Sequence, residues 1–260
     1  MLKNLAVLFA GLTLTLSWMS CEKASEPNNE PFILSYGDSI LYLKPVSGDY
    51  IVYPTIQRPG TYSGFPEGIE IDDVTGAINI SKSETGLRYR ITHVSPRGDT
   101  TKTMVVLSGI TFTDHFYRLS SGDSIANPVY NAHPNRILPL SGSVFDEDNL
   151  ANTGGCAVKT DNGKINLAES IRKGVFGSNP RNDDKKEIEI KYRINDGSGK
   201  SLNKLKVLLY WYNTMADVPQ YVWDILNDRA NQGVFLRNNI VLRTEQLAKP
   251  RPPCVIIIAN

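Results

Sequence analysis

The feature that most constrains this chain is a series of short alternating segments separated by tight turns. In residues 69–71 and again in residues 78–80, two isoleucines flank one polar residue, and the sequence DDVTG lies close before the second pair. Such alternation is typical of strands with one buried face. A type I turn closed by a left-handed residue joins such strands, and Gly76 fits there because glycine adopts positive φ without steric cost. The stretch therefore predicts a hairpin within mainly β-structure.

The same stretch resembles bacterial Ig-like and cadherin-like domains. Their recurring pattern is P-x-G-(I/L)-x-(I/L)-D-x-x-T-G-x-I, followed by a turn and a Tyr-rich strand. The matching residues are Pro66, Gly68, Ile69, Ile71, Asp72, Thr75, Gly76 and Ile78. The resemblance covers roughly residues 32–110. It implies an antiparallel β-sandwich of a kind used mostly as a spacer or adhesion module.

A second copy of this pattern is expected further along the chain. The sequence GAINISKS (76–83) resembles GKINLAES (163–170), and YRIT (89–92) resembles YRIN (192–195). The alternative is chance, because short β-sheet sequences recur. A true repeat predicts an all-β fold with two Ig-like antiparallel β-sandwich domains, in residues 32–110 and 111–260. The second copy carries extra residues between its two matches, including LAESIRKG, which indicates a helical turn ended by Gly174.

One segment departs from the β pattern and predicts a C-terminal amphipathic helix. Residues 216–233 carry apolar side chains at helical spacing. Asp217 can cap this helix, Gln220 can complete a capping box and Gly233 can end it. Beyond it, the apolar run 255–258 predicts a buried or sheet-closing strand. The second sandwich is therefore expected to carry helical insertions.

The N-terminus predicts export and lipid anchoring. Lys3 precedes an apolar run that is too short to span a membrane, and Ser20 stands directly before Cys21. This arrangement resembles the bacterial lipoprotein signal, although Trp18 stands where an aliphatic residue is usual. The alternative is an ordinary secreted protein. The resemblance implies a signal peptide (1–20), acylation of Cys21 and a polar tether (21–31), which places the protein in the cell envelope, attached to the outer membrane through its lipid.

The net charge of the chain limits its binding partners. Without residues 1–20 the chain has 27 basic and 27 acidic residues, so its net charge predicts no attraction to nucleic acid.

Beyond Cys21, two cysteines remain, Cys156 and Cys254. An even number outside the cytoplasm permits a disulfide, and two separate buried thiols are the alternative.

No motif predicts catalysis or a cofactor. The three histidines lack metal-ligand spacing, and the nucleophile and phosphate-binding motifs are missing from the sequence. Asp146 and Asp148 could offer oxygens to Ca²⁺, but the glycine and distal glutamate of an EF-hand are missing, so a solvated turn is the preferred interpretation. A carboxylate pair for glycoside hydrolysis meets only in the fold and stays open.

Aromatic residues are the remaining indication of a binding site. We expect Trp211, Tyr117 and Tyr130 to be candidate ligand-binding residues, since sugar and protein surfaces use exposed aromatic faces. Trp211 is preferred because it opposes the face that carries Leu208, Tyr210 and Tyr212.

The sequence thus predicts a non-enzymatic, lipid-anchored binding or adhesion module for a glycan or an envelope protein. The alternatives are a glycan-processing lipoprotein and a pilus-type subunit. Against the pilus subunit, the first arginine after Cys21 is Arg58, inside the first expected sandwich.

Overall fold

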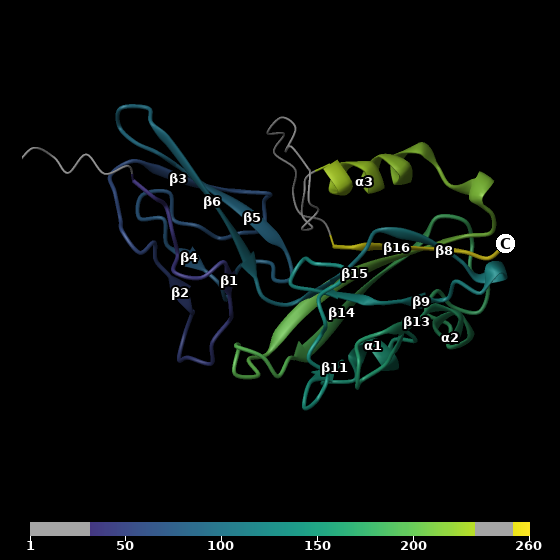
Figure 1. Ribbon diagram of the computed structural model, residues 1–260. Helices are drawn as coiled ribbons and strands as arrows, with labels where there is room; N and C mark the ends of the chain where they lie inside the picture. The colour runs from purple at the N-terminus through teal and green to yellow at the C-terminus, as the bar shows by residue number, and fades with distance from the viewer. Residues whose placement is uncertain (1–31, 232–251) are drawn as a thin grey trace, which may run out of the picture. The chain divides into compact units, whose positions relative to one another are not determined.

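The computed structural model describes residues 32–231 and 252–260 (Figure 1). The signal peptide, Cys21 and the tether expected from the sequence lie outside the described residues. From Ile33 to Asn260 the chain forms one compact unit. For description we call residues 33–107 the N-terminal region and residues 110–260 the C-terminal region; the division into two domains remains a prediction. The expected boundary after residue 110 falls inside a strand.

The fold is mostly β, as the sequence predicts. The N-terminal region contains β1 (Ile40–Leu41), β2 (Ile51–Val52), β3 (Thr61–Phe65), β4 (Ile78–Asn79), β5 (Arg88–Val94) and β6 (Thr100–Leu107). The strands of the C-terminal region are β7 (Ile110–Phe112), β8 (His115–Arg118), β9 (Ile125–Ala126), β10 (Pro128–Tyr130), β11 (Val144–Phe145), β12 (Ala157–Val158), β13 (Ile165–Asn166), β14 (Asp184–Arg193), β15 (Asn203–Tyr212) and β16 (Cys254–Ile258). Its helices are η1 (Leu119–Ser121), α1 (Leu150–Thr153), α2 (Leu167–Arg172), η2 (Met215–Asp217) and α3 (Gln220–Asn231).

The N-terminal region is built on a sheet with strand order β1-β6-β5-β3. β5 is antiparallel to both β3 and β6, whereas β1 pairs with β6 in parallel. Along β5 buried and less buried residues alternate, and Tyr89, Ile91 and His93 point into the core. The predicted strand with one buried face is therefore confirmed.

The C-terminal region has a five-stranded sheet with strand order β11-β14-β15-β16-β8. β14 and β15 form a long antiparallel pair, and β16 is parallel to both of its neighbours. One face of this sheet packs into a large core, which we call the main core. The other face carries Tyr210, Tyr212, Ile256 and Ile258 under α3, and we call this group the α3 cluster. Figure 1 shows α3 lying along β16 and β15.

Burial on both faces explains the continuous apolar run of β16. Val255 and Ile257 belong to the main core, whereas Cys254, Ile256 and Ile258 belong to the α3 cluster. A strand covered on both sides has no face for polar residues, so alternation is lost. The predicted buried strand at 255–258 is confirmed.

The predicted helix exists, but its start differs from the prediction. Asp217 does not cap α3: its carboxylate accepts hydrogen bonds from the Thr214 N–H (2.9 Å) and hydroxyl (2.7 Å), in a capping box around η2. Gln220 instead donates to Asp224, one turn along α3. Pro219 lies between the two helices, and Gly233 lies outside the described residues. Thr214, three residues before Asp217, is the capping residue that sequence reasoning missed.

The turns that lead into the two matching sequences, residues 72–77 and 159–164, have the same closing backbone bonds. In the first turn, the Asp72 N–H donates to the Ala77 carbonyl and the Gly76 N–H donates to the Asp72 carbonyl, both at 2.9 Å. Residues 159–164, which lie 87 positions later, make the same two bonds at 2.8 Å. Both closing glycines have positive φ, +71° at Gly76 and +70° at Gly163. The expected repeat is thus confirmed at the level of the turn.

The second match, YRIT with YRIN, is shifted in register. Tyr62 packs under the Gly76 turn and pairs with His93, whereas Phe145 packs under the Gly163 turn and pairs with Tyr192. Tyr192 is therefore the counterpart of His93 and not of Tyr89. Side chains of a strand alternate between its two faces, so a shift by an even number of residues, here four, leaves each alternating set on the same face. The alternation alone therefore could not reveal the shift in register.

Candidate functional site

The short helix α1 is held in place by a buried carboxylate. Asp146 is 2% exposed, and its oxygens accept hydrogen bonds from the N–H groups of Ala151 and Asn152, both at 3.0 Å. The Asn152 side chain also donates to Asp146 at 2.7 Å and to the Val158 carbonyl at 2.9 Å. Asp146 and Asn149 both adopt positive φ (53° and 57°), a conformation that Asp and Asn tolerate better than most residues. These bonds fix α1 against β12.

Helix α2 is anchored by the serine of the repeat. The Ser170 hydroxyl donates to the Asn166 carbonyl at 2.7 Å and accepts the Ala157 N–H at 2.8 Å. The Asn166 side chain caps the helix by accepting the Glu169 N–H at 2.9 Å. Ser83 makes the corresponding bonds to Asn79 and Glu70 in the N-terminal region. The second copy therefore uses bonds that both copies share to support a helix. The predicted stop of this helix is also found, since Gly174, with a φ of 77°, follows α2.

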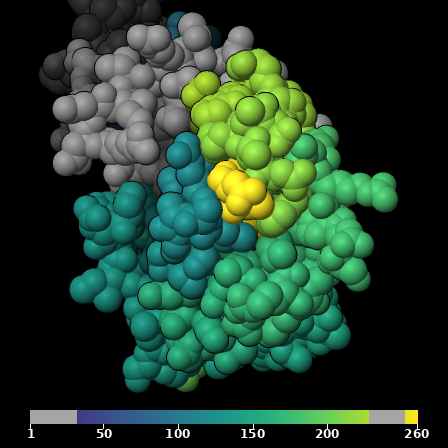
Figure 2. Space-filling model, turned by 90° about the vertical axis from the view of Figure 1, so that its right-hand side faces the viewer, coloured from purple at the N-terminus to yellow at the C-terminus, as the bar shows by residue number. Residues whose placement is uncertain are grey.

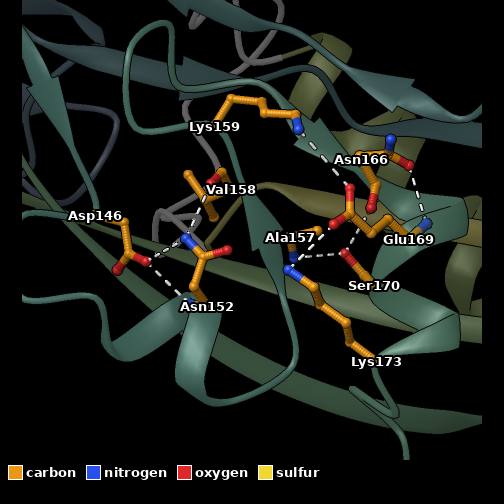
Figure 3. A network of polar contacts seen from close by, with 9 residues as sticks. All are labelled: Asp146, Asn152, Ala157, Val158, Lys159, Asn166, Glu169, Ser170 and Lys173. Atoms are coloured by element: carbon orange, nitrogen blue, oxygen red, sulfur yellow. Dashed lines mark hydrogen bonds and ion pairs between the residues drawn. The ribbon is translucent and has the colours of Figure 1, made fainter.

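An open polar hollow of about 650 Å³ lies beside these two helices, and we call it the α1–α2 hollow. Its lining residues come from α1, from the Gly163 turn and from the end of α2; they are Asn149, Asn152, Thr153, Val158, Lys159, Thr160, Asp161 and Lys173. Figure 3 shows Lys159 and Lys173 both directed toward Glu169. The distances from their Nζ atoms to the Glu169 carboxylate are 3.9 and 3.2 Å.

The charges around the hollow nearly cancel. Hydrogen bonding to Lys173, with the charges of both lysines, holds the pKa of Glu169 below its usual range, so this carboxylate stays ionised. Glu169 and Asp161 then balance the two lysines. With two amides and two hydroxyls also in the lining, the hollow offers hydrogen-bond donors and acceptors but little net charge.

The three aromatic residues predicted to bind a ligand are all buried. Trp211 is 7% exposed, Tyr117 6% and Tyr130 5%, and all three belong to the main core. The expectation of an exposed Trp211 ring is wrong. Leu208, Tyr210 and Tyr212 do share the opposite face, as predicted, but α3 covers that face and the main core covers the other.

All three aromatic residues have structural partners, and the Trp211 indole N–H donates to Asn213 at 3.3 Å. The Tyr130 hydroxyl donates to Asp196 at 2.6 Å, and the same carboxylate accepts the Ser108 hydroxyl at 3.2 Å. Tyr117 lies on β8, paired with Ile257, and its ring meets His115 edge-on. Burial raises the pKa of both tyrosines well above the usual value. These residues therefore hold the fold together.

More exposed aromatic rings lie on α3. Tyr221 is 38% and Trp223 37% exposed, and the Trp223 ring packs against Phe116 at a centroid distance of 4.4 Å. The sequence pattern does not single out these two rings, because spacing alone does not say which side of a helix faces the sheet.

Cys156 and Cys254 do not form a disulfide. Cys156 lies in the main core and Cys254 in the α3 cluster, so the sheet separates the two side chains. Of the two alternatives from the sequence, separate buried thiols is the one observed.

The acidic segment is not arranged for calcium. The oxygens of Asp146 are taken up by α1, so its expected solvation is also wrong, and Asp148 forms an ion pair with Lys191 at 2.8 Å. Across residues 32–231 and 252–260, no group of three or more acidic, His or Cys side chains is placed to hold a metal ion.

A larger groove of about 840 Å³ also exists, lined by residues 80–85 and by parts of β14 and β15. Three of its lysines, Lys82, Lys191 and Lys206, are paired with carboxylates outside its lining. The lysines of the α1–α2 hollow are paired in the same way, with Glu169, so ion pairing does not decide between the two. We favour the α1–α2 hollow because helices α1 and α2 frame it.

Sequence reasoning did not find Asn152, Lys159 or Lys173. For Lys173 the available signal was the set of residues that the second copy adds between its two matches, since the end of α2 and the loop after it lie there. Asn152 and Lys159 precede both matches and carried no such signal. Within the described part of the chain, no helix has the length and apolar character needed to cross a membrane. Comparison of the chain with protein-family models and with curated proteins finds no match.

Proposed function

We propose that this chain is a lipid-anchored envelope protein whose C-terminal region binds a glycan without cleaving it. We further propose that both regions are Ig-like sandwiches. The parallel pairing of β1 with β6 beside antiparallel β5 supports this, as does the turn shared by the two regions.

The observation that carries the proposal is where the hollow lies. The Gly163 turn repeats the two closing backbone bonds of the Gly76 turn, and the hollow is formed where helices α1 and α2 are added to that shared frame. Binding residues gather on segments held by a rigid scaffold. Additions to a repeated scaffold are therefore the natural place for a ligand.

The chemistry of the hollow favours a neutral, hydroxyl-rich ligand. Amide, hydroxyl, ammonium and carboxylate groups can together match sugar hydroxyls, which both donate and accept. Nearly balanced charges give no preference for an anion. Asp161 lines the hollow, whereas the Glu169 carboxylate beside it is paired with Lys159 and Lys173. Glycoside hydrolysis usually needs two carboxyl groups that face the sugar, so we favour binding over cleavage.

The test is a panel of neutral and charged polysaccharides in affinity electrophoresis, with reducing ends measured in parallel. We expect retardation by one or more neutral polysaccharides and no new reducing ends. New reducing ends would replace the proposal by a glycan-processing enzyme. Retardation by none of them would leave a protein partner as the better interpretation and contradict glycan binding.

A further inference from the structure

The side chain of Asn152 lies between a buried carboxylate and the α1–α2 hollow. Its amide nitrogen donates to Asp146 at 2.7 Å and to the Val158 carbonyl at 2.9 Å. An amide nitrogen carries two hydrogens, so both are used. The amide oxygen, Oδ1, accepts no hydrogen bond from the described residues, and Asn152 lines the hollow. Figure 3 shows this oxygen turned away from Asp146.

The surrounding bonds allow the Asn152 amide only one orientation. Both oxygens of Asp146 already accept backbone N–H groups, from Ala151 and from Asn152, and the Val158 carbonyl is also an acceptor. A reversed amide would bring Oδ1 against these acceptors and would leave its own nitrogen without them. Since the orientation of an amide follows from its hydrogen-bond network, Oδ1 is a fixed acceptor on the side of the hollow.

Thr153 adds a second acceptor to the same helix. Its hydroxyl donates to the Asn149 carbonyl at 2.7 Å, so the one hydrogen of this hydroxyl is used. The Asn149 side chain reaches the hydroxyl oxygen only at 3.4 Å. The oxygen therefore keeps accepting capacity, and α1 presents acceptors to the hollow from two neighbouring residues.

The lysines supply donors from the Gly163 turn and from the end of α2. An ammonium group carries three hydrogens and no lone pair. Lys159 and Lys173 both line the hollow, and both direct their groups at one carboxylate, Glu169. Hydrogens that Glu169 does not take are left for a ligand. The hollow thus has a polarity, with acceptors on α1 and donors on the lysines.

Helix α3 leaves this part of the molecule uncovered. In Figure 1, α1 and α2 lie on one side of the five-stranded sheet and α3 lies on the other. Figure 2 shows the same separation of α3, in yellow-green, from the teal and green residues below it. Asn152 is half-buried and Thr153 is exposed, so a ligand can reach the acceptors of α1.

We propose that Asn152, oriented by Asp146, is a specificity-determining residue that selects a sugar hydroxyl able to donate to Oδ1. This proposal rests on the glycan binding proposed above. A methyl ether at that hydroxyl has no hydrogen to donate, so Oδ1 would lose its contact with water and gain no partner. Sites built to bond a hydroxyl reject analogues that lack it for this reason. A ligand edge that carries only acceptors, such as a carboxylate, is disfavoured at α1 in the same way.

One arm of the test needs no ligand. Heteronuclear NMR of the full chain measures hydrogen exchange at the side-chain amide of Asn152. The reference is Asn135, whose exposed side chain lies outside the lining of the hollow. We expect exchange at Asn152 to be slower by about tenfold or more, because both hydrogens are bonded. Exchange as fast as at Asn135 would overturn the proposal, whether or not a polysaccharide binds.

The second arm compares each neutral polysaccharide of the panel with its O-methylated form by affinity electrophoresis. The proteins are the unaltered chain, Asn152→Ala and the control Asn135→Ala. Asn152→Ala keeps the backbone bonds from α1 to Asp146, and circular dichroism checks that each variant folds. We expect the unaltered chain and Asn135→Ala to prefer the unmethylated form by about tenfold, and Asn152→Ala to lose most of this preference.

The preference between the two forms separates selection from support of the helix. An equal loss of affinity for both forms in Asn152→Ala would mean that Asn152 only holds α1, and would overturn the proposal. An unaltered chain without preference would overturn it as well. Slow exchange at Asn152 without retardation by any polysaccharide would support the fixed acceptor and contradict glycan binding.

Discussion

The turn at residues 72–77 and the turn at residues 159–164 share their backbone bonds but lead into different structures. After the first, Ser83 and Asn79 close a short non-helical turn. After the second, Ser170 and Asn166 make the same bonds within α2, beside the α1–α2 hollow. The comparison teaches that one hydrogen-bond frame serves as plain structure in one region and supports a candidate binding site in the other.

The largest expected effect concerns the covered sheet of the C-terminal region. We expect Trp211→Ala to lower the free energy of unfolding by about 3–5 kcal/mol, as for other buried tryptophans. Met104 on β6 is 38% exposed, so Met104→Ala should cost far less, on the order of 1 kcal/mol or below. Urea denaturation of both variants measures the difference. Equal, small losses would mean that Trp211 lies outside the core.

The closing glycines test whether the two turns are equivalent. A Cβ atom at Gly76 would lie 2.6 Å from the Tyr62 ring, and one at Gly163 would lie 2.8 Å from the Phe145 ring. We expect Gly76→Ala and Gly163→Ala each to cost about 2–4 kcal/mol, from left-handed strain and overpacking together.

Gly98 is the matched control for these glycines. It has a φ of +90° but no atom within 4 Å of its Cβ position, so Gly98→Ala should cost only the backbone strain, about 1–2 kcal/mol. Thermal denaturation followed by circular dichroism decides. If only one of the two turn variants were destabilised beyond Gly98→Ala, the two turns would not be packed alike.

The shared serines give a smaller effect of the same kind. Ser83→Ala and Ser170→Ala each remove one hydroxyl that donates to an asparagine carbonyl and accepts a backbone N–H. We expect each to cost about 1–3 kcal/mol, because the N–H loses its partner, and the double variant to show their sum, since the sites are separate. A loss at Ser170 alone would limit the frame to the second copy.

Much of this fold was readable from the sequence because local chemistry decides it. The alternation in β5, the Gly76 turn and the Gly174 stop each depend on neighbouring residues. The positions of Trp211 and Cys254 do not, because the main core that buries Trp211 and the sheet that receives β16 are assembled from distant parts of the chain. The α1–α2 hollow depends on Asp146 turning inward to hold α1, and a sequence shows a carboxylate without showing its direction.

The smallest effect at neutral pH concerns the buried thiol of Cys156, which lies next to Ser170 in the second copy. Burial raises the pKa of this thiol to about 12. The folded protein then keeps a proton that the unfolded chain releases above about pH 8.5. The resulting stability is fully present below that pH and is lost as pH rises toward 12.

Cys156→Ala removes this titration but keeps the other groups. We expect the difference in melting temperature between the unaltered protein and Cys156→Ala to be constant from pH 6 to 8 and to shift toward the variant by pH 10.5. A difference that stays constant up to pH 10.5 would show that the thiol is not buried.

The central claim is that the hollow formed where α1 and α2 meet the Gly163 turn carries binding, while the first copy is plain scaffold. The most direct measurement is the affinity of the full chain for the polysaccharide that retards it most, compared among Asp161→Ala, Lys173→Ala and Lys82→Ala. All three side chains are exposed, so folding should be unchanged. We predict at least tenfold weaker binding for Asp161→Ala and Lys173→Ala, and unchanged binding for Lys82→Ala beside the first turn. Equal affinities in all three, or a loss confined to Lys82→Ala, would contradict the account.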